Sequence, residues 1–489
     1  MKDKIQDLLY CKPKLERIAN LINIPMTKSV KFQFVTLLGL ISASCFAQVY
    51  QPDWVSLDKR PVPEWFNEAK FGIFIHWGVY SVPAWAPANE DIGVYAKYAE
   101  WYWNRLMIDD GKAHKFFKDH HLKTYGPDFV YQDFAPLFKA EFFNPDQWAE
   151  IFEKSGAKYV VLTSKHHEGF TLWPSAQSWN WNSVDVGPHR DLAGDLSRAV
   201  KSKGLHMGFY YSLYEWFNPL YTSNLEKYVN EHMILQMKDL VSRYQPDILW
   251  TDGEWEHTSD EWKSKEFLSW LFNESSVRSK VVVNDRWGKE TRGRHGGIYT
   301  TEYNLVDDKL ADEEIAHPVE ECRGIGTSFG YNRVEDLGNY MSSKALVELL
   351  IEKVSNGSNL LLDIGPTSDG LIPVIMQERL LDMGAWLKLN GEAIYNTRIW
   401  KNRPKQLKEK GIFFTSKNKT LYVILTKWPS ETIEIPGITR AGKVEMIGSA
   451  IKPSVRTFGG KVIINLPGGI PPDISDRLAW VIKFENALE

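Results

Sequence analysis

Three carboxylates follow directly on an apolar run in residues 246–256, which read PDILWTDGEWE. Asp252 ends the run, Glu254 and Glu256 follow it, and tryptophans are interleaved with the acids. A pair of carboxylates is the minimal equipment for hydrolysing a glycosidic bond, and the flat face of an indole covers the C–H surface of a sugar ring. The stretch is therefore either a solvated loop after a strand or the mouth of an active site.

Asp252 lies at the end of a strand-like run beside aromatic residues, which is the position expected of a nucleophile. Two other glutamates are candidate partners, Glu302 in GGIYTTEY and Glu320 in HPVEEC. At a site that hydrolyses with retention of configuration, the partner lies about 5–5.5 Å from the nucleophile and has a raised pKa, so that it can donate a proton. The sequence leaves both partners open.

Histidines and one arginine supply further polar groups. His76 and the adjacent pair His166 and His167 could bind zinc, but no HExxH pattern is present, and neighbouring side chains on a strand point to opposite faces. We therefore expect these histidines to bind sugar hydroxyls, without a metal or other cofactor. Arg286, in NDRW, is either a structural ion-pair partner or a donor to a substrate hydroxyl.

The elements that must position these groups alternate along residues 52–395. Apolar, strand-like runs occupy residues 71–78, 158–167, 206–212, 247–253, 281–287 and 359–365. Amphipathic stretches such as NPDQWAEIFEKSGA and SKALVELLIEKVSNGS lie between them. This alternation predicts an α/β fold with a parallel sheet and crossover helices, and the length of the region favours a (β/α)8-like TIM barrel with long loops. No GxGxxG or P-loop pattern follows a strand, which argues against nucleotide binding.

Polar side chains stand where these runs stop. They are His76, His166, His167, Tyr211, Asp252, Arg286 and Asp363. In a barrel enzyme the carboxyl ends of the strands converge on one mouth, where the chemistry is placed. The strand ends therefore predict a single site.

The character of the chain changes near Ile399. Short alternating runs such as TLYVILTKW, TIEIPGI and KVIINLP follow, separated by turn residues and without helical periodicity. This pattern predicts a small antiparallel β-sandwich over residues 399–489.

The first residues are typical of a processed leader. From Met26, two lysines precede an apolar run that ends in small residues, as in a secretory signal peptide, and the run is too short to span a membrane. We expect residues 1–47 to be an upstream extension and signal peptide, with translation starting at Met26; lipid attachment at Cys45 is the less favoured alternative. Only Cys322 remains beyond this leader, so no intramolecular disulfide can form. Export to a bacterial periplasm or exterior is expected.

Composition excludes one class of partner. The 489 residues carry a formal net charge of −4, which argues against binding to nucleic acid. The chain also contains 20 Trp, most of which are expected in the core, although tryptophan also suits sugar binding.

Several long motifs resemble the α-L-fucosidases of glycoside hydrolase family 29. They run in the family's order through residues 55–397 and include WFNEAKFGIFIHWGVYSVPAW, TSKHHEGFTLWPS, LWTDGEWE, VVVNDRWG, SFGYN and LLLDIGPTSDG. The segments HGGIY and FLSW are similar to the broad-specificity branch that includes the animal lysosomal enzymes. The resemblance implies a retaining double displacement on a (β/α)8-like barrel followed by a C-terminal β-sandwich, with no metal.

Residue roles follow from the positions that match these motifs. The resemblance implies that Asp252 is the nucleophile, that Trp250 lines the pocket, and that Phe329 packs against the C5 methyl group of fucose. Fucose hydroxyls and ring would be held by His76, Glu100, Trp101, His166 and His167, with further contacts from Tyr211 and Arg286.

The acid/base position varies between branches of the family. Glu302, in a TEY pattern, resembles the glutamate of many bacterial members, whereas Glu320 corresponds to a W-E-x-C pattern. Val319 stands here where that pattern has tryptophan, so Glu302 is the preferred acid/base and Glu320 the alternative.

The resemblance implies a retaining, exo-acting α-L-fucosidase. Its substrate would be a fucosylated oligosaccharide, glycoconjugate or fucan, and oligomerisation is possible. A non-catalytic fucose-binding protein and a hydrolase of α-L-galactosides are the alternatives, and the apolar wall at Phe329 disfavours the second because galactose carries an added hydroxyl.

Overall fold

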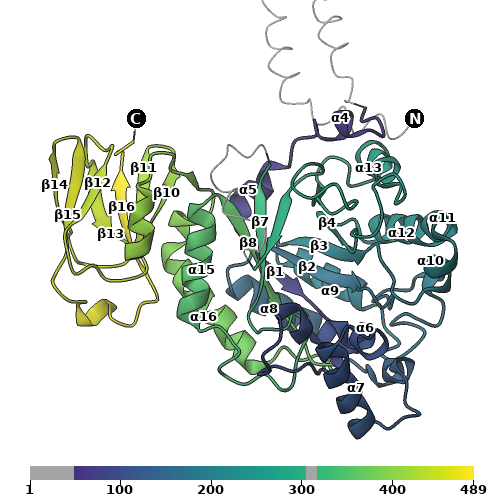
Figure 1. The fold of residues 1–489 in the computed structure, drawn as a ribbon. Coiled ribbons are helices and arrows are strands. Elements are labelled where there is room, and N and C mark those ends of the chain that lie inside the picture. The colour runs from purple at the N-terminus through teal and green to yellow at the C-terminus, as the bar shows by residue number, and fades with distance from the viewer. Residues whose placement is uncertain (1–48, 304–316, 489) are drawn as a thin grey trace, which may run out of the picture. The chain divides into compact units, whose positions relative to one another are not determined.

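Eight parallel strands form the central sheet in the computed structural model, which describes residues 49–303 and 317–488 (Figure 1). The strands are β1 Phe71–Ile75, β2 Tyr159–Lys165, β3 His206–Ser212, β4 Ile248–Asp252, β5 Val282–Val283, β6 Tyr299–Glu302, β7 Val319–Gly324 and β8 Ser358–Ile364. They are arranged in the order β5-β4-β3-β2-β1-β8-β7-β6. The amide of Ile298, just before β6, donates to the carbonyl of Val283 in β5 at 2.9 Å. The two end strands therefore meet, and the predicted barrel-like fold is confirmed.

The strands read as apolar runs because both faces of the sheet are covered. Every residue of β1, β2 and β4 is buried, as expected for parallel strands with helices outside and packed side chains inside. The inner face of the barrel includes Phe74, Tyr159, Tyr210, Trp250 and Cys322, which belong to one buried cluster. Residues of opposite parity on the same strands pack outward against the helices.

Helices connect the strands. They are α4 Trp54–Leu57, α5 Glu64–Ala69, α6 Tyr102–Met107, α7 Lys112–Thr124, α8 Pro145–Lys154, α9 Leu192–Ser202, α10 Pro219–Ser223, α11 Leu225–Tyr228, α12 Ile234–Tyr244, α13 Ser264–Asn273, α15 Ser343–Ser355 and α16 Val374–Asn390. Side chains of Asn144, Asp191 and Ser342 accept hydrogen bonds from the first turns of α8, α9 and α15. These caps satisfy amide groups that would otherwise lack a partner at each helix start.

The sequence predicts a strand over residues 281–287, but β5 ends at Val283. The side chain of Asn284 then replaces the backbone ladder: its Nδ2 donates to the carbonyl of Thr251 at 2.7 Å, and its Oδ1 accepts from the Thr251 amide at 3.2 Å. Because the side chain of Asn284 takes the place of backbone hydrogen bonds, the residues after it leave the sheet. Arg286 can then turn toward Asp252.

The C-terminal strands form two antiparallel sheets, as predicted. One has the order β13-β16-β11-β10-β9 and the other β12-β15-β14. Their bounds are β9 Arg398–Ile399, β10 Ile412–Lys417, β11 Thr420–Leu425, β12 Ile433–Pro436, β13 Lys443–Met446, β14 Ser454–Phe458, β15 Lys461–Asn465 and β16 Trp480–Glu485. Their inner faces share a core of their own that includes Val423, Ile435 and Ile464.

The central strand β11 of the five-stranded sheet is covered on both faces. Along β11, Leu421, Val423 and Leu425 face the C-terminal core, whereas Tyr422 and Ile424 belong to the larger core of the barrel and its helices. The indole Nε1 of Trp386 in α16 also donates to the carbonyl of Ala479 at 3.0 Å. The sheet therefore contributes residues to two hydrophobic cores.

The chain divides into two units, Met1–Val49 and Tyr50–Glu489, and all of these elements belong to the second. The predicted leader over residues 1–47 lies outside the described residues. No helix in residues 49–303 or 317–488 is both long and apolar enough to cross a bilayer.

A substitution in α16 tests the packing of helices around the barrel. A Cβ atom at Gly384 would lie 1.9 Å from the carbonyl oxygen of Lys154, at the end of α8. In a free helix, Gly→Ala stabilises by about 1 kcal/mol. Here we expect Gly384→Ala to lower the free energy of unfolding by about 1–3 kcal/mol because the two helices are forced apart. Chemical denaturation would measure this, with Glu378→Ala on the exposed face of α16 as control; a gain in stability for Gly384→Ala would contradict the packing.

Candidate active site

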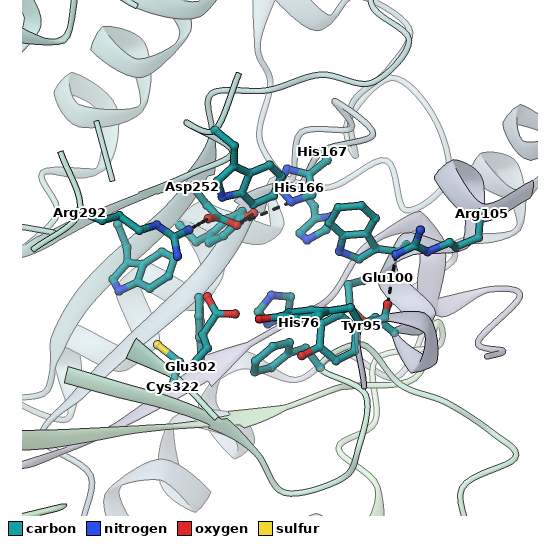
Figure 2. A pocket seen from close by; sticks show the side chains of 17 residues that line it. His76, Tyr95, Glu100, Arg105, His166, His167, Asp252, Arg292, Glu302 and Cys322 are labelled. Carbon is teal, nitrogen blue, oxygen red and sulfur yellow. Dashed lines mark hydrogen bonds and ion pairs between the residues drawn. The ribbon is translucent and has the colours of Figure 1, made fainter. Parts of the chain in front are cut away.

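A pocket of about 340 Å³ opens at the carboxyl ends of the barrel strands. Most of the predicted site residues line it, namely His76, Glu100, Trp101, His166, His167, Trp250, Asp252, Glu302 and Phe329. Figure 2 shows the carboxyl groups of Asp252 and Glu302 within this pocket, with His76, His166 and His167 also facing it. The structure therefore brings together side chains that lie in, or directly after, β1, β2, β4 and β6 and are far apart in the sequence.

Asp252, the last residue of β4, is held by hydrogen bonds on both carboxylate oxygens. Nη1 of Arg286 donates to Oδ1 at 2.7 Å, and the hydroxyl of Tyr210 donates to Oδ2 at 3.0 Å. Nε2 of His167 lies 3.6 Å from Oδ2, and Nη2 of Arg292 lies 3.6 Å from Oδ1. Burial raises the pKa of Asp252, but the charges of Arg286 and, less strongly, Arg292 outweigh this effect and hold the pKa well below its usual range. Asp252 is therefore an ionised carboxylate.

Glu302, the last residue of β6, binds the same guanidinium. Its Oε1 forms an ion pair with Nη2 of Arg286, and its side chain is 21% exposed, so it is open to the pocket. The guanidinium of Arg286 therefore binds both carboxyl groups, one through each terminal nitrogen.

Arg286 is an ion-pair partner, one of the two roles that the sequence left open. Its side chain is only 1% exposed, its Nε donates to Thr300 Oγ1 at 2.9 Å, and its guanidinium lies 4.3 Å above the ring of Trp250. The two carboxylates and this aromatic ring take up the charge of the buried cation.

Glu320 lies beneath the pocket rather than on its wall. The side chain is fully buried inside the barrel, where it accepts hydrogen bonds from the hydroxyl of Tyr159 and, at 3.0 Å, from Nε1 of Trp250. Burial raises the pKa of Glu320 to about 7, although these two donors and the charge of Arg286 work in the opposite direction. The contacts make Glu320 a support for Trp250, which in turn lies under the guanidinium of Arg286.

The prediction for Tyr211 is wrong by one residue. The hydroxyl of Tyr211 donates to Oε1 of Gln236 at 2.7 Å, and Lys165 lies 4.1 Å from its ring, so the side chain faces outward. Tyr210 faces inward, lines the pocket and contacts Asp252. Successive side chains of a strand alternate between faces, and the motif alone does not say which tyrosine points into the barrel.

The histidines are oriented by partners behind the pocket. Nδ1 of His76 lies 2.6 Å from Asp363 Oδ1, and Nδ1 of His167 lies 2.6 Å from Ser212 Oγ. Burial, reinforced by the neighbouring His166, lowers the pKa of both His76 and His167 well below the usual value. Both rings are therefore neutral, and both line the pocket, where a neutral imidazole can form hydrogen bonds with hydroxyl groups.

A second buried acid connects the pocket to the loop that carries Phe329. Glu100 accepts hydrogen bonds from the Gly330 amide at 2.8 Å and from Ser328 Oγ at 3.2 Å. The ring of Phe329 lies 5.0 Å from that of His76 in a stacked arrangement. An apolar ring and several hydrogen-bonding groups therefore line the same pocket.

Other lining residues were missed by the sequence reasoning. They are Phe74, Tyr95, Tyr98, Arg105, Tyr210, Trp255, Arg292 and Cys322. Tyr95 lies in a short 3₁₀ helix, Arg105 in the short helix α6 and Arg292 in a turn, so no strand-end signal identifies them. Trp255 belongs to the acidic stretch at residues 246–256, where its spacing of three residues from Asp252 was a usable signal. Glu254, in the same stretch, is buried and forms an ion pair with Nε of Arg292.

The described residues contain no group of three or more His, Cys, Asp or Glu side chains arranged to hold a metal ion. Cys322 is free and buried.

The environment of Glu320 predicts a pH-dependent effect on stability. Because burial raises its folded-state pKa to about 7, above the unfolded value of about 4.3, its contribution to stability is lost as the pH rises through 7. Glu320→Gln removes this titration. We expect the free energy of unfolding of the variant, minus that of the wild type, to rise by roughly 3 kcal/mol between pH 4 and pH 8.

Denaturant unfolding at both pH values would measure the difference, with the exposed Glu378→Gln as control. A difference that does not change with pH would show that Glu320 does not titrate in this way.

Comparison with known proteins agrees with this arrangement. The family model described as Alpha-L-fucosidase matches residues 40–392. Tissue alpha-L-fucosidase of Rattus norvegicus is 43% identical over 466 residues, covering 92% of this chain and 96% of the relative, and that of Homo sapiens is 44% identical over 448 residues, covering 89% and 91%. The crystal structure of Thermotoga maritima alpha-fucosidase in complex with fucose superposes with a TM-score of 0.74 at 37% identity, covering 89% of this chain and 99% of that one. The chain belongs to the α-L-fucosidases of glycoside hydrolase family 29.

Proposed function

We propose that this protein hydrolyses terminal α-L-fucosyl residues of glycans with retention of configuration. The observation that carries the proposal is the pair of carboxylates, Asp252 and Glu302, held by the two terminal nitrogens of Arg286 at the wall of one pocket. Such a pair, with one member ionised and one open to the leaving group, is the equipment of a retaining glycosidase. The substrate class is a fucosylated oligosaccharide, glycoconjugate or fucan.

In the first step Asp252 is the nucleophile. One of its carboxylate oxygens bonds to C1 of the fucosyl unit while the bond from C1 to the glycosidic oxygen breaks. Glu302 gives its proton to that departing oxygen, so the leaving sugar is released as an alcohol. The depressed pKa of Asp252 suits this role because the attacking group must be ionised.

In the second step Glu302 is the base. It takes a proton from water, the water oxygen bonds to C1, and the bond between C1 and Asp252 breaks. Both carboxyl groups return to their starting states. Two inversions at C1 give a fucose product with the configuration of the substrate.

The fucosyl unit itself is recognised by the inner part of the pocket. Neutral His76 and His167 supply hydrogen bonds to hydroxyl groups, and the ring of Phe329 offers an apolar surface to the C5 methyl group. A sugar with a hydroxymethyl group at C5 would place an oxygen against that ring, which favours α-L-fucosides over α-L-galactosides.

The remaining expectations concern the whole chain. We infer that residues 1–47 are a leader for export, that residues 52–395 form the catalytic domain, and that residues 399–489 form the β-sandwich domain. Release of the aryl alcohol from a chromogenic aryl α-L-fucoside, with the fucose anomer followed by NMR, tests the activity directly. A wild-type protein that binds fucose but releases no chromophore would contradict the proposal.

Azide rescue would distinguish the two candidates for the acid/base. Glu302→Ala should lower kcat by roughly 10²–10⁴-fold on an aryl fucoside because the base for the second step is lost. Azide needs no base, so it should restore turnover and give fucosyl azide with the configuration of the substrate.

Glu320→Ala is the matched comparison. It removes a support of Trp250, so activity should fall without rescue by azide. Rescue of Glu320→Ala, and not of Glu302→Ala, would reverse the assignment.

Two adjacent tyrosines provide a second matched pair. Tyr210→Phe removes a hydrogen bond to the carboxylate of Asp252 and should lower kcat/KM by roughly 10- to 100-fold. Tyr211→Phe removes only the hydrogen bond to Gln236, so it should lower stability by about 1 kcal/mol with little change in kcat/KM. Kinetics on an aryl fucoside and denaturant unfolding would measure both. A larger loss of activity in Tyr211→Phe would show that the inward-facing tyrosine is misassigned.

A further inference from the structure

The pocket has a buried inner part and an exposed rim. Trp250, His76 and Asp252 in the inner part are 1%, 4% and 8% exposed, respectively. At the rim, by contrast, Tyr95 is 49% and Trp255 39% exposed, although both line the same pocket. Aromatic side chains that are exposed together at the edge of a pocket are typical of a ligand-binding surface.

We propose that Trp255, Tyr95 and Arg292 form a separate subsite for the sugar that leaves when the fucosyl unit is transferred to Asp252. This inference rests on the proposed function, because a leaving sugar exists only if the protein cleaves a fucosyl glycan. The ligand class is a pyranose, such as a hexose or an N-acetylhexosamine, linked to the fucosyl unit.

Trp255 is held in place from behind. Its ring centroid lies 5.3 Å from that of His167 and 6.1 Å from that of Trp101, with which it is stacked at 30°. These contacts fix the indole near the buried histidines while more than a third of the residue stays exposed. An indole with this support can cover the C–H face of a sugar ring at little cost in side-chain entropy.

Tyr95 approaches the reacting groups from a different segment. It belongs to the 3₁₀ helix η2, Val94–Lys97, and its ring packs edge-on against Tyr98 at 5.6 Å. Partial burial, followed by the nearby charge of Glu302, raises the pKa of Tyr95, whereas Arg292 and Arg286 lower it. Tyr95 lines the same pocket as Glu302, whose carboxyl group would protonate the leaving oxygen. In Figure 2 it is drawn at the pocket with Glu302 and His76.

Arg292 supplies hydrogen-bond donors at the same rim. Its side chain is 34% exposed, Nε is bound by Glu254, and Nη2 lies 3.6 Å from Oδ1 of Asp252. A guanidinium carries five N–H groups in a fixed plane. The ion pair with Glu254 holds that plane, so the outer donors can meet hydroxyl groups of a sugar placed next to the reacting carbon.

Aromatic faces combined with hydroxyl-binding donors are what a sugar requires. The proposed subsite also predicts different kinetics for two kinds of substrate. A substrate whose leaving group is a single atom cannot reach the rim, whereas a disaccharide must occupy it.

The test compares kcat/KM on α-L-fucosyl fluoride with kcat/KM on a fucosyl-galactose disaccharide. For Trp255→Ala and for Tyr95→Ala we expect a loss of roughly tenfold on the disaccharide and a loss of less than about twofold on the fluoride. Trp255→Phe keeps an aromatic face and should recover part of the activity on the disaccharide. Trp179→Ala removes an exposed tryptophan that does not line the pocket, and should change neither value.

An equal loss on both substrates would overturn the subsite, because it would mean that the rim residues only support the inner pocket. No loss on the disaccharide would overturn it as well. If the wild type hydrolyses neither substrate, the proposed function fails and the subsite with it. Wild-type turnover of both substrates, without a selective loss in the variants, would contradict the subsite alone.

Discussion

The ion pairs of Arg286 are the interactions on which the site depends. A fully buried guanidinium loses several kcal/mol of hydration, so it is retained only where opposite charge and hydrogen bonds offset that loss. Here Asp252 and Glu302 bind its two terminal nitrogens, Thr300 accepts from Nε, and the ring of Trp250 lies beneath it. Burial alone raises the pKa of Asp252, and the charge of Arg286 is the largest influence that lowers it again. The same group therefore binds both acids and keeps Asp252 ionised.

Behind this ion pair, a column of side chains runs through the barrel. Glu320 on β7 accepts a hydrogen bond from Trp250 on β4, and the indole ring supports the guanidinium. Tyr210 on β3 is the cross-strand neighbour of Trp250 and reaches Asp252 from the other side. Inward-facing residues of different strands thus position one another, and the loops that carry Arg286 and Phe329 complete the pocket. The fold contributes to the chemistry mainly through this rigid inner layer.

Much of the architecture could be predicted from the sequence because it depends on local periodicity. The apolar runs that became β1 to β4 and β8 are buried on both faces, so their composition identified them. The strands β6 and β7, with the sequences YTTE and VEECRG, gave no such signal because they are short and carry carboxylates inside the barrel. Strand ends located Asp252 and the histidines. The choice between Tyr210 and Tyr211 was missed because it depends on which face of β3 turns inward. The roles of Arg286 and Glu320 depend on which side chains of other strands they contact inside the barrel. Sequence spacing does not contain that information.

The five-stranded C-terminal sheet has a consequence for how the protein can be divided. Because alternate residues of β11 belong to two different cores, neither core is complete without the sheet. Cutting the chain after α16 would expose the surface that Tyr422 and Ile424 cover, along with the carbonyl partner of Trp386. We therefore expect the barrel and the C-terminal strands to unfold together, and the C-terminal region to resist exchange or removal as a separate module.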